Sequence, residues 1–169
     1  MTKIVELTKG MISYEKGEPK RVQHFLKVYA YAKLIGESEH VEERIREIVE
    51  AAALVHDIGI QPALQKYGSS NGIYQQKEGP VVAERMLRRF GFDEELIRRV
   101  SFLVGHHHTY TGIDGIDYQI LVEADFLVNI DEGEMNLPQI LSVKENVFRT
   151  RTGIEILNDL FLSEKMLDK

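Results

Sequence analysis

Apolar side chains recur at helical spacing along almost all of this 169-residue chain, and this periodicity limits the folds that it can adopt. No run alternates between apolar and polar residues as a half-buried strand would, and no repeat or linker divides the chain. We therefore expect one all-α domain over residues 1–169, a bundle of about seven to eight helices. The amphipathic stripes place helices near residues 4–14, 19–36, 45–57, 79–91, 93–104, 118–130, 138–148 and 152–164.

Two segments depart from the amphipathic pattern. The third predicted helix becomes apolar on every side over Ala51–Val55, which is typical of a helix at the centre of a core. Between Gly59 and Lys77 the helical pattern breaks at a proline and several glycines and serines. A long irregular segment in a compact domain is either a lid or binding loop or a plain surface connection, and the sequence leaves both open.

The composition narrows the chemistry. The chain has no cysteine, so a disulfide framework, a thiolate zinc site and a cysteine nucleophile are excluded, and a metal would need His, Asp or Glu ligands. The net charge of −6 argues against binding to a nucleic acid polymer and favours a small-molecule partner. No apolar run has the length of a signal peptide or a membrane span, so we expect a cytoplasmic protein without membrane association. A homodimer stays open.

Two aspartates interrupt apolar helix faces. Asp57 ends the most apolar helix, where burial and the negative end of the helix dipole both make an uncompensated carboxylate costly. Asp125 shares a predicted face with Tyr118, Leu121 and Val128, so it should also point inward. A nearby cation would stabilise both carboxylates, although a helix cap or an arginine partner would also account for Asp125.

Histidines gather near the same positions. His56 lies on the inward stripe of the third helix, and His24 lies at the edge of the apolar stripe of the second. His107 continues the apolar stripe of the helix before it, with His106 and His108 on either side. Two histidines and two aspartates on three helices form a nitrogen and oxygen donor set that suits Fe, Mn, Co, Ni or Zn, and Mg is also allowed.

The order of these residues resembles a known family. His24, then Ala53-Leu-Val-His-Asp-Ile-Gly59, then Glu123-Ala-Asp125 is similar to the H…HD…D motif of the HD superfamily of metal-dependent phosphohydrolases. The resemblance covers roughly residues 21–129. It implies a helical bundle with a divalent metal at its centre, a motif-bearing core over about 19–130 and C-terminal helices over 138–166 that pack on it. The metal ligands it implies are His24, His56, Asp57 and Asp125.

The same resemblance raises the question of a second metal. Some members of the superfamily carry two further histidines and hold two metals. At the first of these positions this chain has Glu78, and at the second it has His106 or His107. The glutamate departs from the pattern, so one tightly held metal is expected, with a second allowed at Glu78, His106 and His107.

The activity that the resemblance implies is hydrolysis of a nucleotide or another small phosphate ester. The metal would polarise a phosphoryl oxygen and lower the pKa of a bound water. Asp57 would both bind the metal and orient that water, and His106 or His107 would donate a proton to the leaving oxygen or bind phosphate. Lys77 and Arg21 are candidates for phosphate binding, because they lie close in sequence to the proposed ligands.

Two alternatives come from other classes of function. An HD-type oxygenase would need two irons, so metal stoichiometry and oxygen dependence discriminate it from a hydrolase. A sensor or scaffold would keep the metal only as a structural element, and it would fail a phosphatase screen with added Mn or Co. The sequence identifies neither the substrate nor the metal.

Overall fold

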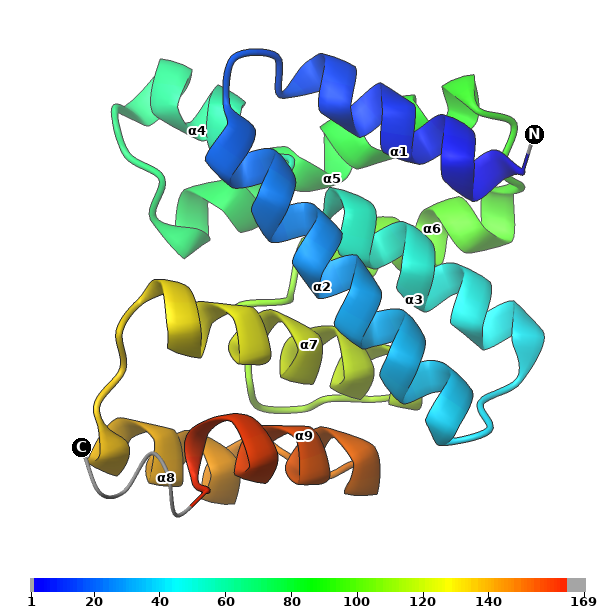
Figure 1. Cartoon of the computed structure of the whole chain (residues 1–169). Coiled ribbons are helices and arrows are strands. Elements are labelled where there is room, and N and C mark those ends of the chain that lie inside the picture. Colours follow the sequence, from blue (N-terminus) through cyan, green and yellow to red (C-terminus); the bar gives the residue numbers. More distant parts are fainter. Residues whose placement is uncertain (1, 164–169) are drawn as a thin grey trace.

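The computed structural model describes residues 2–163 and folds them into nine α-helices, with no strand among them (Figure 1). The all-α prediction is confirmed. The helices are α1 (Lys3–Tyr14), α2 (Pro19–Ser38), α3 (Glu43–Val55), α4 (Ile60–Tyr67), α5 (Gly72–Arg89), α6 (Glu94–Val104), α7 (Ile116–Glu132), α8 (Leu137–Asn146) and α9 (Arg151–Phe161). None of the described helices has the length and apolarity that a membrane crossing requires.

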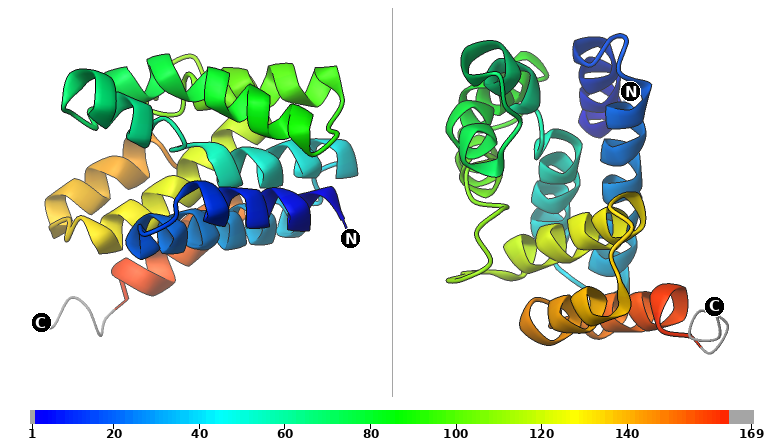
Figure 2. Two further views of the ribbon diagram at one scale, coloured as in Figure 1. Left: turned by 90° about the horizontal axis from the view of Figure 1, so that it is seen from above. Right: turned by 90° about the vertical axis from the view of Figure 1, so that its left-hand side faces the viewer.

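Helix α3 occupies the centre of the bundle, as its apolar sequence predicts. It packs against α1, α2, α6 and α7, and every residue of Ala51–Val55 is fully buried. Figure 2 shows α3 (cyan) between the blue α1–α2 pair and the green α5–α6 pair. The α1–α2 pair and the α5–α6 pair thus form layers on either side of α3, which carries the His56–Asp57 pair at its C-terminus.

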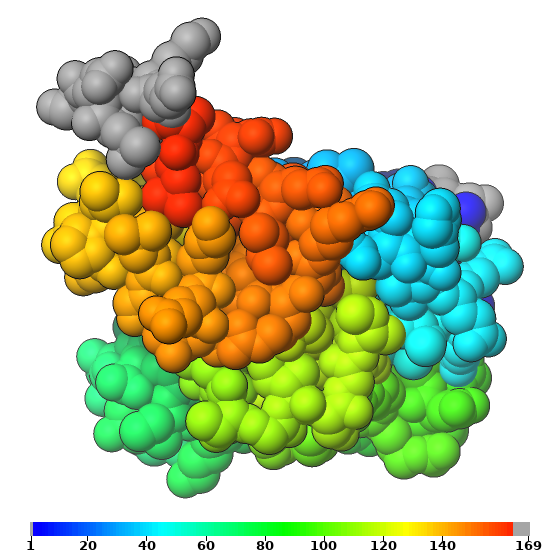
Figure 3. Space-filling model, turned by 90° about the horizontal axis from the view of Figure 1, so that it is seen from below, coloured from blue at the N-terminus to red at the C-terminus, as the bar shows by residue number. Residues whose placement is uncertain are grey.

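Helix α7 is a second central helix. Its residues from Asp117 to Val128 are all buried, because α2 and α3 cover one side and α9 covers another. Figure 3 shows the outer surface of this region, where α8 and α9 (orange) lie over the yellow-green segment that includes the start of α7. The two C-terminal helices α8 and α9 follow α7, and α9 packs on α2 and α7, while residues 164–166 of the predicted range lie outside the described residues.

The prediction of an irregular stretch between Gly59 and Lys77 is wrong, because most of this segment is helical. It contains α4 and the first turn and a half of α5, so only four residues, 68–71, connect the two helices. Pro62 lies in the first turn of α4, where a missing backbone N–H is tolerated. Gly68 ends α4 with a left-handed φ of 63°, and the Asn71 side chain accepts a hydrogen bond from the backbone N–H of Ile73 to start α5. Short helices with such signals at both ends are easily read as loops.

Helix α5 also begins earlier than its sequence suggests. We expected the helix to open at Gly79-Pro80, but Pro80 lies in its interior. The first half of α5 packs closely against the backbone of Gly59. A Cβ atom built on Gly59 would lie 2.5 Å from the carbonyl oxygen of Gln75 and 2.8 Å from the backbone nitrogen of Gly79. The chain that leaves α3 thus touches the backbone of α5 directly, which requires glycine at position 59.

Candidate metal centre

The His56–Asp57 pair follows directly on α3, inside the bundle. His56 is completely buried and its backbone continues the helical conformation, with φ −57° and ψ −41°. Its Nδ1 lies 2.9 Å from the carbonyl oxygen of Ala53, one turn earlier in the helix. Because a carbonyl only accepts, Nδ1 carries the proton and Nε2 presents a lone pair to the interior.

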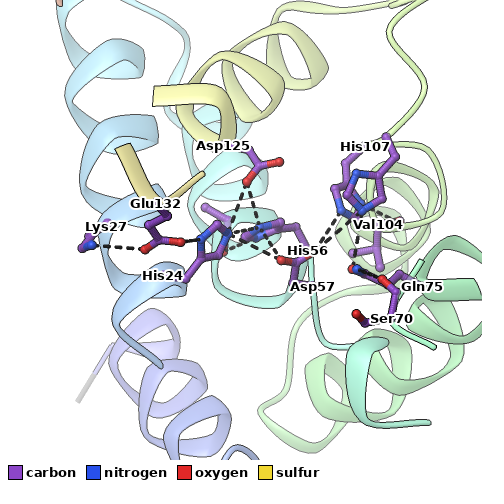
Figure 4. Close-up of polar contacts among 12 residues, drawn as sticks. His24, Lys27, His56, Asp57, Ser70, Gln75, Val104, His107, Asp125 and Glu132 are labelled. Atoms are coloured by element: carbon purple, nitrogen blue, oxygen red, sulfur yellow. Dashed lines mark hydrogen bonds and ion pairs between the residues drawn. The ribbon is translucent and has the colours of Figure 1, made fainter. Parts of the chain in front are cut away.

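His24 on α2 and Asp125 on α7 meet this pair from the two neighbouring helices (Figure 4). The Nε2 atoms of His24 and His56 lie 3.1 Å apart. The Oδ1 atom of Asp125 lies 3.2 Å from Nε2 of His24 and 3.5 Å from Nε2 of His56. On the other side, Oδ2 of Asp57 lies 3.5 Å and 3.6 Å from the same two nitrogens. Four donor atoms from three helices therefore converge on one small volume.

The outer nitrogen of His24 is also fixed. Its Nδ1 lies 2.8 Å from Oε2 of Glu132, the last residue of α7, and a carboxylate accepts this proton. A histidine held in this way by a carboxylate or a carbonyl is the usual outer shell of a metal site, because it fixes the ring and leaves Nε2 free to bind. Glu132 is two helical turns after Asp125, so it was in principle visible on the same predicted face.

The donor set fits a divalent cation. Two imidazole lone pairs 3.1 Å apart repel each other unless a proton or a metal lies between them. The Oδ1 atom of Asp125 is buried and has no hydrogen-bond partner among the described residues. Buried polar atoms without partners are rare in folded proteins, and a bound ion is one of their explanations. His24, His56 and Asp57 moreover offer ligand atoms that all lie within 4.8 Å of one another.

The pKa shifts within the cluster also favour a bound cation. Burial alone would raise the pKa of Asp57, but the charges of His56 and His107 lower it to about 2. Burial lowers the pKa of His24, whereas the adjacent carboxylate of Asp125 and the charge of Asp57 raise it to about 9. Both pKa shifts show that positive charge is favoured between the carboxylates of Asp57 and Asp125. A divalent metal would supply this charge in place of a proton.

The sequence model of the HD domain family matches residues 21–142, which is most of the chain and includes all four converging residues. The chain belongs to the HD domain family. It also matches the crystal structure of a predicted HD superfamily hydrolase from an uncultured Thermotogales bacterium, with 23% identity and a TM-score of 0.62 over 92% of this chain and 82% of that chain. At this identity the likeness shows the fold alone. A search of curated proteins finds no match.

The HD superfamily comprises metal-dependent hydrolases, and the residues of the H…HD…D motif in this chain are the four that the structure brings together. His24 depended almost entirely on the family resemblance at the level of sequence. Its buried position, at 8% exposure, and its contact with His56 now support it independently. The set can hold a divalent metal through nitrogen and oxygen donors.

A second group of donors lies on the other side of Asp57. Its Oδ1 atom is 3.1 Å from Nε2 of His107 and 3.9 Å from Nε2 of His108, and these three residues form a second set of close ligand atoms. The Nδ1 atom of His107 lies 2.9 Å from the carbonyl oxygen of Val104, so its Nε2 also faces inward. Burial and the neighbouring His107 lower the pKa of His108 to about 4, which leaves it a neutral donor.

His108 is a residue to which sequence reasoning assigned no role. Helical periodicity placed His107 on the inward stripe and put His106 and His108 on either side of it. Helix α6, however, ends at Val104, and the following turn brings His108 round beside His107, with ring centroids 3.9 Å apart. The signal that could have found it is the glycine at position 105, which is typical of a helix end.

Other predicted site residues are engaged elsewhere. His106 is exposed, stacks on Phe102 and directs Nδ1 to the carbonyl oxygen of that residue at 2.7 Å. Glu78 accepts a hydrogen bond from the hydroxyl of Tyr67 at 2.9 Å and pairs with Lys66. The structure therefore brings His107, and not His106 or Glu78, to the Asp57 carboxylate.

The two candidates for phosphate binding also have other contacts. The guanidinium of Arg21 lies 2.7 Å from the buried carboxylate of Glu15 and 3.5 Å from that of Glu18. The ammonium of Lys77 lies over the ring of Tyr67, 5.4 Å from its centroid. Neither side chain is among the groups that converge at the HD pair.

The α4–α5 segment forms one wall of the second group. Gln76 accepts hydrogen bonds through Oε1 from the backbone N–H of His108 at 3.1 Å and from the hydroxyl of Thr109 at 3.3 Å. Gln75 is buried and donates to the carbonyl oxygen of Ser70 at 2.7 Å (Figure 4). The region in which the sequence allowed a binding loop thus does border the site, as a helix that holds the histidine turn.

Proposed function

We propose that this protein is a metal-dependent phosphohydrolase that acts on a nucleotide or another small phosphate ester. The observation that carries the proposal is the convergence of imidazole Nε2 atoms, each fixed by an acceptor at Nδ1, on the buried carboxylate of Asp125 and the partly exposed carboxylate of Asp57. Membership of the HD family supports hydrolysis as the class of reaction. A phosphate ester is the substrate class that suits a site in which a dication offsets negative charge.

His24, His56, Asp57 and Asp125 would hold the metal in this proposal. The bound ion would supply Lewis acidity toward a phosphoryl oxygen and make a water acidic near neutral pH. Asp57 lies between the two groups of donors, so its carboxylate can orient a water for attack. His107 faces the same carboxylate through Nε2 and can hold a proton there for the leaving oxygen.

A second metal at Asp57, His107 and His108 is the finer form of the proposal. These residues replace the set of Glu78, His106 and His107 that the family pattern suggested, with only His107 in common. His107 would then be a ligand, and the proton for the leaving oxygen would have to come from another group. Lys77 and Arg21 stay predictions as phosphate-binding residues, because their contacts with Tyr67 and Glu15 give them no support.

The test joins metal analysis to activity. Purified protein should contain about one equivalent of a transition metal and hydrolyse members of a panel of nucleotides, sugar phosphates and p-nitrophenyl phosphate when Mn or Co is added. His56→Ala should lose both metal and activity, whereas His40→Ala, at an exposed turn, should keep both. A His56→Ala protein with full metal content and full activity would refute the proposal.

The same experiment separates the alternatives. Two irons per chain with oxygen consumption and no phosphate release would identify an oxygenase. One tightly bound metal with no activity on any phosphate ester would favour a sensor or scaffold. Metal content is measured by elemental analysis, so it is read independently of activity.

A further inference from the structure

A groove with a volume of about 760 Å³ runs between α1 and α5, away from the HD residues. Its α5 side is formed by the second half of that helix, from Val82 to Phe90, whereas Gln75 and Gln76 in the first half contact the histidine turn. At the rise of an α-helix, roughly 15 Å separates Gln75 from Arg85. The volume falls in the range of pockets for small organic molecules, about 300–1,000 Å³.

The groove is rich in unpaired positive charge. Lys9 on α1 and Arg85 and Arg89 on α5 line it, against a single carboxylate, that of Glu6. Within residues 2–163, none of these three cations forms an ion pair with a carboxylate. Arg88 on the same helix shows the contrast, because it pairs with Glu84 at 3.0 Å and with Glu94 at 2.8 Å. This local excess of cations occurs in a chain whose net charge is −6.

The two arginines are suitably placed to act together. They are four residues apart on one helix, so their side chains leave the same face. Guanidinium groups bind phosphate through two parallel hydrogen bonds, which is stronger and more directional than binding by an ammonium. Two arginines and a lysine that line one groove are the kinds of side chain that bind a phosphate group.

The floor of the groove is apolar and partly aromatic. Val82, Met86, Phe90 and Tyr14 line it and are only partly buried by the protein itself. Phe90 reaches across to α1, where a Cβ atom on Gly10 would lie 2.3 Å from its ring. A flat ring could stack on such a surface while a phosphate reaches the arginines, so a ligand with an aromatic base and a phosphate matches both parts.

We propose that the α1–α5 groove is a binding site for a nucleoside monophosphate, separate from the metal centre. The phosphate is bound by Arg85, Arg89 and Lys9, and the base lies on the floor that Met86 and Phe90 form. The proposal rests on residues that take no part in the proposed hydrolysis, so each can fail without the other.

The test is calorimetric titration of the full chain with AMP in the presence of a chelator, which removes metal from the HD site. Saturable binding is expected, and Arg85→Gln combined with Arg89→Gln should weaken it by about tenfold or more. Arg88→Gln is the matched control on the same helix and should leave the affinity unchanged. Ribose 5-phosphate, without a base, and adenosine, without a phosphate, should each bind at least about tenfold more weakly than AMP.

Nuclear magnetic resonance locates the ligand. AMP should shift the amide resonances of Gly10 and Val82 and leave that of Asp57 in place. Absence of saturable binding at millimolar AMP would overturn the proposal. So would an equal loss of affinity in Arg88→Gln, or shifts centred on Asp57 instead of on the groove.

Discussion

A substitution of Gly59 tests how closely the HD turn, residues 56–59 between α3 and α4, packs on α5. The backbone of Gly59 is in the right-handed helical region, with φ −75° and ψ −8°, so alanine can adopt this conformation without strain. The obstacle is steric only. The new Cβ atom would lie 2.5 Å from the carbonyl oxygen of Gln75, whereas a carbon and an oxygen normally approach no closer than about 3.3 Å. The two backbones would have to part by roughly 0.8 Å.

Gly59→Ala should therefore destabilise the fold. Because the obstructing atoms belong to the backbone, no side-chain rotation relieves the clash, and the cost should be about 1–3 kcal/mol, as for other overpacked sites. For a chain of this size each kcal/mol lowers Tm by about 2–4 °C. Urea denaturation and thermal unfolding, both followed by circular dichroism, measure the change. A displaced α5 would also move Gln76 away from His108, so metal binding at the second group should weaken.

Gly36→Ala is the control for this substitution. Gly36 lies within α2, and a Cβ atom there would meet only the flexible side chain of Arg46, at 3.4 Å. Because alanine is the better helix former by about 1 kcal/mol, this variant should be as stable as the wild type or more stable. If Gly59→Ala were also as stable as the wild type, the inferred close contact between the HD turn and α5 would be wrong.

Three further perturbations test the rest of the fold and the site. Glu123→Ala should cost about 3 kcal/mol or more, because its buried carboxylate accepts hydrogen bonds from the backbone N–H groups at positions 149 and 150, from a glutamine amide and from a threonine hydroxyl. Asp93→Asn keeps the helix cap but loses the ion pair with Arg44. In the wild type this ion pair lowers the pKa of Asp93 from 3.8 to about 2. A carboxylate whose pKa is lower in the folded state than in the unfolded state stabilises the fold at pH values above its unfolded-state pKa. The Tm difference between Asp93→Asn and the wild type should therefore be full above pH 3.8 and shrink as the pH falls toward 2. Glu132→Ala removes the acceptor for Nδ1 of His24 and should weaken metal binding by about tenfold or more, measured by competition with a chelating dye.

Matched controls accompany these variants. Glu145→Ala and Glu134→Ala remove exposed carboxylates and should leave the free energy of unfolding and the metal affinity unchanged. A Glu123→Ala protein as stable as Glu145→Ala would contradict the role of Glu123 in fixing the start of α9. A constant Tm difference for Asp93→Asn between pH 5 and pH 2, or unaltered metal binding in Glu132→Ala, would contradict the other two arguments.

Sequence reasoning singled out the centre of the candidate site because its residues violate the rule that apolar helix faces bury apolar side chains. Asp57 and Asp125 stood out in this way, and His56 lay on the same stripe. Periodicity says which face of a helix a residue occupies. Asp125 lies within α7 and His56 keeps a helical backbone after α3, so periodicity decides the direction of both side chains. His24, at the edge of its stripe, needed the family motif.

The remaining parts of the site depend on features that periodicity does not describe. His108 and Gln76 meet where the chain has left α6, so no helical register relates them. Helix α4 has only eight residues and contains Pro62, too few for a stripe to emerge. The α1–α5 groove likewise requires two helices to lie side by side, and only the folded chain brings Lys9 and Arg85 to the lining of one pocket.

Asp57 lies between the two donor groups, so the charge of its carboxylate would contribute to cation binding in both. One oxygen faces His24 and His56 and the other faces His107 and His108, so a cation bound on either side draws on the same single negative charge. Occupancy of the first group should therefore lower affinity at the second, and thermodynamic reciprocity requires the converse to the same degree. Metal titrations of the wild type should accordingly show two steps of unequal affinity, whereas substitution of His107 should remove the weaker step and leave the stronger one.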